Sequence, residues 1–351
     1  MVKAFQFKKE ASQYYKRAAD KGEMHSMFNY GMMLYNGDGI PVDKKEAARY
    51  FRYAANKGHV NAGIKYASML SKFEATETDQ SEVARFYKFA ADNGDIISMF
   101  YYARILFNGQ GVPMNKQESV KYFKCAADKG EINSIYNYAL ILSNGYGTNI
   151  NKKEAAVYFK CAADKGQSFA MNDYACMLFT GDGIDQNKSE AFKYFKMAAD
   201  KGNASSMNFL AQMLYFGDSV PTDIESALIY WKNAALKGHV KSMYNYAFSL
   251  LKNHKNYSDE SKNEIVKFLK LAAEKGHLKA MFQYAIILRN GVFGEFNKVE
   301  AAKYFKMAAD QGDVDSMNCY GQMLMNGEGI NADKNEAEKY LKLANEKANL
   351  M

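Results

Sequence analysis

One serine and lysine pair in this sequence has a spacing that serine hydrolases use. Ser249 and Lys252 match the SxxK motif, in which the lysine helps the serine hydroxyl to attack an acyl group. The SDN and KTG elements that accompany this motif are missing from the chain. Ser249 also occupies the same register as Met177 and Met213, which we expect to be buried on helices. We therefore expect no acyl-enzyme chemistry at this pair.

Histidine is scarce and is not spaced as a metal site. The five histidines are His25, His59, His239, His254 and His277. Three of them, His59, His239 and His277, each follow a glycine directly. No two form an HxxxH pair, which would place two imidazoles on one helix face. We expect these side chains to cap helices or face solvent, and we expect no metal.

Pairs of glycines one residue apart, such as Gly37-Asp-Gly39 and Gly181-Asp-Gly183, resemble phosphate-binding loops at first sight. A P-loop needs the pattern GxxxxGK[ST] after a strand, and the chain has no such pattern. The glycine pair instead recurs along the chain, as a structural turn would. We expect no cofactor and no small-molecule substrate, and we expect the chain not to be an enzyme.

Composition and charge argue against a secreted protein and against a nucleic-acid-binding protein. Lys and Arg exceed Asp and Glu by 46 to 39 among 351 residues, which is a small excess without strong clustering. Met1–Glu10 contains no apolar signal-peptide core. No apolar run reaches the roughly 18 residues that a membrane span needs. We expect a cytoplasmic or nuclear protein without a membrane span.

The cysteines fit the same expectation. Cys125, Cys161, Cys176 and Cys319 form no CxxC pair, and the first two lie 36 residues apart. This pattern predicts reduced, semi-buried thiols.

A repeat of 36 residues runs along the chain. Glycines recur at this spacing at Gly22, Gly58, Gly94, Gly130, Gly166, Gly202 and Gly238, followed by Gly276 and Gly312. An Ala-Ala pair precedes each of these glycines at a fixed distance. The predicted units are residues 7–42, 43–78, 79–114, 115–150, 151–186, 187–222, 223–260, 261–296 and 297–332, with a C-terminal half-unit at 333–351.

Each unit has the pattern of two helices joined by short turns. In the unit 151–186, Asn151 and Glu154 have the spacing of a capping box and begin a first helix that runs through Lys165. Gly166 supplies the left-handed conformation that ends it, and a second helix is predicted over 168–179. The same cap recurs at Asp43/Glu46, Asp79/Glu82, Asn115/Glu118, Asn187/Glu190, Asn297/Glu300 and Asp333/Glu336. No single pair buries its apolar face, so the pairs must stack.

These features resemble the Sel-1-like repeat family, a relative of tetratricopeptide repeats. The resemblance rests on the Tyr-Phe-Lys-x-Ala-Ala-Asp-Lys-Gly run, the following Met-x-x-Tyr-Ala and the Gly-x-Gly loop, as in residues 116–146. It covers nearly the whole chain. It implies an all-α, α/α right-handed superhelical solenoid of about nine and a half helix-turn-helix repeats, whose first helices line the concave surface. It also implies a scaffold or adaptor role, as in signalling, quality control at the endoplasmic reticulum or host–microbe contact.

The exposed face of the first helices is predicted to be basic. The position of Lys160 is Lys or Arg in every unit, and an acidic residue follows four positions later in most units. The candidate protein-binding residues are Arg49, Arg52, Arg85, Lys88, Lys121, Lys124, Lys160, Lys193 and Lys196. They would favour an acidic, extended partner segment. The alternative is a solvated face of mutual ion pairs, each worth about a few tenths of a kcal/mol.

Two further questions stay open at the level of sequence. The Gly-x-Gly loop is replaced at 71–79 and 251–259, and its second glycine is lost at Ser219. These changes indicate either specific docking loops or drift of tolerant surface loops. The leading functional hypothesis is a non-catalytic interaction scaffold. The alternative is a regulatory arm of a larger enzyme, such as a kinase or a ubiquitin-ligase complex.

Overall fold

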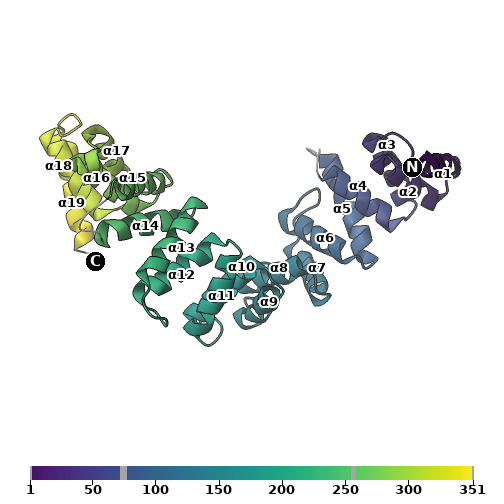
Figure 1. The fold of residues 1–351 in the computed structure, drawn as a ribbon, viewed down its shortest axis with the longest axis horizontal. Coiled ribbons are helices and arrows are strands. Elements are labelled where there is room, and N and C mark those ends of the chain that lie inside the picture. The colour runs from purple at the N-terminus through teal and green to yellow at the C-terminus, as the bar shows by residue number, and fades with distance from the viewer. Residues whose placement is uncertain (1, 72–76, 254–257, 350–351) are drawn as a thin grey trace. The chain divides into compact units, whose positions relative to one another are not determined.

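The protein is built from helix pairs, as seen in a computed structural model that describes residues 2–71, 77–253 and 258–349 (Figure 1). The first helices of the units, called A helices, are α1 (Val2–Asp20), α3 (Lys44–Asn56), α5 (Glu77–Asp92), α7 (Lys116–Asp128), α9 (Lys152–Asp164), α11 (Lys188–Asp200), α13 (Ile224–Leu236), α15 (Asp259–Glu274), α17 (Lys298–Asp310) and α19 (Lys334–Ala348). The second, or B, helices are α2 (Met24–Asn36), α4 (Val60–Leu70), α6 (Ile96–Asn108), α8 (Ile132–Asn144), α10 (Ser168–Thr180), α12 (Ala204–Phe216), α14 (Val240–Asn253), α16 (Leu278–Asn290) and α18 (Val314–Asn326). A short 3-10 turn covers Val292–Gly294. The described residues contain no strand, so the predicted all-α solenoid class is confirmed.

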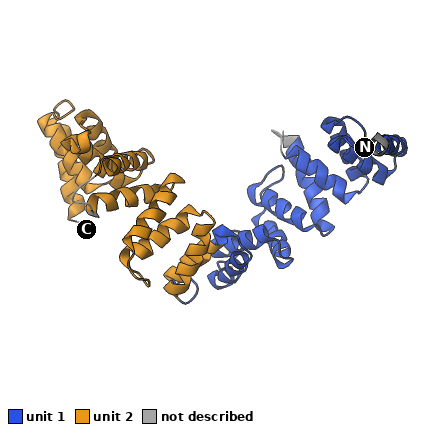
Figure 2. Ribbon diagram, viewed as in Figure 1, with its two compact units in different colours: residues 1–170, 181–185 blue, residues 171–180, 186–351 orange. Residues whose placement is uncertain are grey.

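Contacts fall into two compact units, residues 1–170 with 181–185 and residues 171–180 with 186–351 (Figure 2). Within each, helices next to one another in the chain pack together. The first unit buries Phe51, Tyr66 and Phe86, and the second buries Phe268 and Phe305. Apart from Ala18, the Ala-Ala pairs are almost fully buried in both units, because only a small side chain fits where neighbouring helices approach closely.

The A helices begin with the predicted side-chain caps, but the second half of the capping box differs from the prediction. Asn151 Oδ1 accepts from the Glu154 N–H at 3.1 Å, as predicted. The Glu154 carboxylate bonds the Asn151 side-chain amide instead of its backbone N–H. That N–H already donates to the Leu142 carbonyl of the preceding B helix at 2.8 Å. The equivalent backbone bond is also made by Asp43, Asn115, Asn187, Asp223, Asn297 and Asp333, so at seven A helices the cap residue joins the helix to the one before it.

Two helix starts differ from the predictions. The helix α5 begins at Glu77, so Asp79 lies inside its first turn and is not its N-cap. The helix α1 begins at Val2, five residues before the predicted unit boundary at Phe7. Of the two irregular segments, residues 72–76 and 254–257, which include His254, lie outside the described residues.

The Gly-x-Gly loop lies against the start of the A helix in the same repeat. At Gly147, φ is +78°, and a Cβ there would lie 2.7 Å from the carbonyl carbon of Lys116. Such a distance is too short for a side chain. The second glycine is therefore required by both its backbone conformation and its close approach.

Ser219 takes the place of that second glycine and still adopts the left-handed conformation, with φ of 65°. We expect Ser219→Gly to stabilise the chain by about 0.5–1 kcal/mol. This gain is the left-handed penalty of about 1–2 kcal/mol less the extra unfolded-state entropy of glycine. Urea unfolding of the variant and the wild type measures it. An unchanged or lowered midpoint would show that Ser219 bears no strain.

The three histidines that follow a glycine are N-caps of B helices, as expected. The Nδ1 atom of His59 accepts from the Ala62 N–H at 3.2 Å, and His239 and His277 bond Ser242 and Ala280 in the same way. A protonated Nδ1 cannot accept a hydrogen bond. These caps therefore require neutral imidazoles.

This requirement predicts a pH dependence of stability. Burial lowers the pKa of His59, His239 and His277 below the usual 6.5. Nearby positive charge lowers these pKa values further: His25 acts on His59, Lys241 on His239, and Lys241 and Lys279 on His277. The folded chain then binds fewer protons than the unfolded chain. We expect the stability from these caps to be complete above pH 6.5 and to be lost as pH falls through the lowered pKa values.

Melting temperatures between about pH 7.5 and pH 5 check this expectation. The triple variant His59→Asn, His239→Asn, His277→Asn is the matched control, because Asn203 caps α12 at the equivalent position through its side-chain oxygen. Its melting temperature should vary less over this range than that of the wild type. Equal pH dependence in the two chains would exclude the histidine caps as its cause.

Candidate protein-binding site

A pocket recurs at the same repeat position on the A-helix side of each compact unit. One, of about 550 Å³, lies among α5, α6 and α7, and the other, of about 670 Å³, lies among α17, α18 and α19. The equivalent lining residues include Ala91 and Ala309, Met99 and Met317, Lys121 and Lys339, Tyr122 and Tyr340, and Cys125 and Leu343. Both volumes fall within the range of about 300–1,000 Å³ that is usual for ligand pockets. We call these the A-face pockets.

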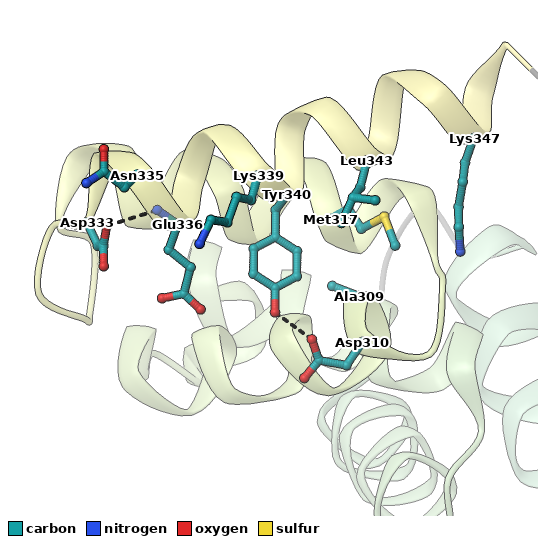
Figure 3. Close-up of a pocket in the computed structure, with 10 residues that line it drawn as sticks. All are labelled: Ala309, Asp310, Met317, Asp333, Asn335, Glu336, Lys339, Tyr340, Leu343 and Lys347. Carbon is teal, nitrogen blue, oxygen red and sulfur yellow. Dashed lines mark hydrogen bonds between the residues drawn. The ribbon is translucent and has the colours of Figure 1, made fainter.

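Figure 3 shows how α19 forms one wall of the second pocket. Glu336, Lys339 and Tyr340 project from this helix toward the segment that carries Ala309 and Asp310. Ala309 is almost fully buried, so a short side chain lies beneath the opening. The pocket exists because alanine at this position leaves the space between successive A helices unfilled.

A tyrosine joins successive A helices beside each pocket. The Tyr122 hydroxyl donates to Asp92 at 2.5 Å, and Tyr340 donates to Asp310 at 2.5 Å. Burial and then the bond to Asp92 raise the pKa of Tyr122 to about 12. Burial acts to raise the pKa of Asp92, but hydrogen bonds from Lys88 and Tyr122 outweigh it and hold that pKa below its usual value.

The sequence reasoning missed this bond, although a signal for it existed. Each tyrosine lies 30 residues after its aspartate, at Tyr50, Tyr122, Tyr158 and Tyr340. From helical spacing alone, the acidic residues near the ends of the A helices would pair only with the lysines four residues before them. In the structure, four of these aspartates also accept a hydrogen bond from a tyrosine of the next A helix, and these bonds hold consecutive repeats together.

Five of the candidate binding residues have acidic partners in the structure. Lys88 and Lys160 pair with the aspartates four residues later, as expected from the sequence. Arg52 instead reaches Glu82 of the next A helix at 2.6 Å. Arg49 pairs with Glu46, and Arg85 lies 3.9 Å from Glu82 while its guanidinium covers the Phe86 ring. These charges are partly neutralised by their neighbours.

The other four candidates are exposed lysines with no ion pair to any described residue. Lys121 and Lys124 lie on α7, in the first compact unit, and Lys121 lines an A-face pocket. Lys193 and Lys196 lie on α11, in the second unit. Among the nine candidates, the positive charge without an ion pair to the described residues therefore lies on α7 and α11.

The position directly after the Lys160 position carries apolar side chains or cysteine in most A helices, and these form a column beside the lysines. Cys125 and Cys161 are exposed, which corrects the prediction of semi-buried thiols, whereas Cys176 and Cys319 are half-buried as predicted. In the same column Tyr53, Met197 and Leu343 are 49%, 44% and 43% exposed. Val157 and Ile229, one turn earlier in the helix, are also exposed. The prediction failed for Cys125 and Cys161 because this column lies at the edge of the buried stripe.

The residues considered for catalysis are not arranged for it. Ser249 and Lys252 line a shared pocket, but no hydrogen bond joins their side chains among the described residues. Nowhere in residues 2–71, 77–253 and 258–349 do three His, Cys, Asp or Glu side chains gather as a metal site. Within the same part of the chain, no helix is both long enough and apolar enough to cross a membrane.

Comparison with known proteins places this geometry in a family. The model of the Sel1 repeat family matches residues 8–23, 25–59, 96–131, 132–167, 168–203, 204–239, 278–313 and 314–349. Most of these segments begin at the start of a B helix and end just after the next A helix. The family model therefore describes the same repeat, counted from its second helix. The unmatched stretches 60–95 and 240–277 contain the two irregular loops. No curated protein matches the sequence.

Solved structures show the same fold. The c5321 protein, a protective antigen of uropathogenic Escherichia coli with an SLR fold, aligns over 97% of this chain and 75% of its own, at 23% identity and a TM-score of 0.84. A Sel1 repeat protein from Oxalobacter formigenes aligns over 95% of this chain and 86% of its own, at 22% identity and a TM-score of 0.54. The repeated family matches, together with the stacked helix pairs, show that this chain belongs to the Sel1 repeat family.

Proposed function

We propose that this chain is a non-catalytic scaffold that binds an extended, acidic segment of another protein along its A helices. The observation that carries this proposal is the A-face pocket beside α7. It combines a cavity of about 550 Å³ with the exposed Cys125 thiol and the Lys121 ammonium group, which forms no ion pair with a described residue. A flat helix face on which every charge is ion-paired would offer a partner neither a cavity nor an uncompensated charge.

The chemistry of the pocket defines the partner. Ala91 and Met99 form an apolar interior that suits an uncharged side chain. The lining also contains the carboxylate of Glu118. Lys121 of the lining and Lys124 on the same helix are exposed and form no ion pair with a described residue, so they favour carboxylates. An extended segment could place an uncharged side chain in this pocket and a carboxylate beside the two lysines.

The double variant Lys121→Glu, Lys124→Glu tests this proposal. The wild type and the variant are used as baits for affinity capture from a cell lysate, followed by titration of synthetic segments from the captured proteins. We expect binding to weaken by about tenfold or more, which corresponds to about 1.4 kcal/mol. Reversing both charges replaces attraction to carboxylates with repulsion. Binding of the wild type should also fall as salt is raised.

The variant Lys241→Glu, Lys279→Glu is the matched control, because it makes the same charge change on exposed positions of two B helices. It should bind like the wild type. Equal loss in both variants would point to net charge alone, and equal retention would exclude the A-helix lysines. Failure of the wild type to bind any protein segment would contradict the scaffold proposal itself.

A further inference from the structure

A smaller pocket opens on the other side of the repeat, between two B helices of the second compact unit. It has a volume of about 190 Å³ and is lined by residues of α12 and α14 and by Trp231 of α13. Phe216 and Phe248 line it and are 73% and 36% exposed. Lys252 contributes a positive charge, and the lining contains no carboxylate.

Two departures from the repeat meet at this pocket. Ser249 is buried at a position where the other units have methionine or isoleucine, namely Met33, Met69, Ile105, Ile141, Met177, Met213, Ile287 and Met323. The short serine side chain leaves space that those larger residues would fill. Trp231, the single tryptophan of the chain, stands where most units have phenylalanine or tyrosine. This combination of serine and tryptophan occurs in no other repeat of the sequence.

Trp231 also leaves a polar group without a partner. Its side chain is 2% exposed, and its indole N–H forms no hydrogen bond with any described residue. A buried donor of this kind destabilises the free protein. Phenylalanine at the same position would pack without this cost.

We propose that this pocket binds one apolar side chain of an extended peptide segment of a partner protein, next to a carboxylate of that segment. The pocket volume is below the range of about 300–1,000 Å³ used for small molecules and equals the share of roughly six waters. It therefore suits a single side chain. The aromatic lining favours an apolar group, and Lys252 favours an adjacent Asp or Glu. No acidic group of the described residues pairs with Lys252.

This site is separate from the A-face pockets, because its lining comes from α12, α13 and α14 and includes no candidate lysine of the A helices. It therefore does not depend on the A-helix proposal. A partner could be held by either surface alone.

A phage library of random 12-residue peptides, selected on the full chain, tests the proposal. Enriched peptides are synthesised and titrated while the fluorescence of Trp231, the only tryptophan, is recorded. Ser249→Met fills the pocket with the residue usual for the repeat, so this variant should keep or raise the melting temperature. Lys252→Glu reverses the charge, and Lys241→Glu is the control at the far end of the same helix.

We expect enriched peptides to share an apolar residue beside Asp or Glu and to change the Trp231 emission. Their binding should weaken by about tenfold or more in Ser249→Met and in Lys252→Glu, and should be unchanged in Lys241→Glu and in Lys121→Glu, Lys124→Glu. The proposal is overturned if no selected peptide loses binding to Ser249→Met. It is also overturned if the peptides that do so carry no carboxylate or bind Lys252→Glu normally.

Discussion

Gly147→Ala is expected to destabilise the chain by about 2–5 kcal/mol. The backbone at Gly147 is left-handed, with φ of +78°, which costs an alanine about 1–2 kcal/mol. In addition, the new Cβ would lie 2.7 Å from the carbonyl carbon of Lys116, and relieving such overpacking costs about 1–3 kcal/mol. The loop cannot move away freely, because Asn151 just after it is bonded to the Leu142 carbonyl. Chemical denaturation measures the loss.

Gly130→Ala in the same repeat separates the two costs. Gly130 is also left-handed, with φ of +89°, but nothing lies within 4 Å of the place that an alanine Cβ would take. This variant should lose only about 1–2 kcal/mol. If both variants lose the same amount, the contact between the loop and the start of α7 contributes nothing to stability.

Phe305→Ala is expected to destabilise its region by about 3–5 kcal/mol, because it leaves a cavity the size of a phenyl ring. Phe305 is fully buried, and its ring lies 5.9 Å from that of Phe282. In a stack of repeats each unit contacts only its neighbours, so the loss should stay local. Hydrogen exchange should show faster exchange in α16, α17 and α18 and unchanged exchange in α1 to α4.

Val299→Ala is the control on the same helix. Val299 is 66% exposed, so its truncation should change the unfolding free energy by less than about 0.5 kcal/mol. Uniform acceleration of exchange along the whole Phe305→Ala chain would mean that the repeats unfold as one cooperative unit. That result would contradict the nearest-neighbour description of this solenoid.

Local patterns of the sequence determined the helices and their ends. The predicted helices of the unit 151–186 agree with α9 and α10 to within a residue or two, because helix periodicity and caps are properties of neighbouring residues. Gly166 is left-handed, with φ of +93°, as predicted. Asp79 shows where this reasoning fails. Its capping pattern is present, yet α5 begins earlier, at Glu77.

The candidate binding residues were only partly predictable. The sequence identified the exposed basic face, and the ion pairs of Lys88 and Lys160 follow from i,i+4 spacing. It gave no indication that Arg52 would turn to Glu82 while Lys121 lacked a partner among the described residues. Whether a basic side chain finds an acidic partner on the next A helix depends on the distance between the two helices. Side-chain reach across a helix crossing is not encoded in spacing along one helix.

The sequence alone therefore determined the repeat, the helix pairs and the absence of a recognisable catalytic motif, because these depend on periodicity and on residue types. Tertiary structure decided which groups meet. It brought Tyr122 of α7 within hydrogen-bonding distance of Asp92 of α5. It also placed Ser249 and Trp231 at one pocket, where the short serine side chain leaves space. Pockets and bonds of this kind arise from the distances between stacked helices, which are set by all the packed side chains together.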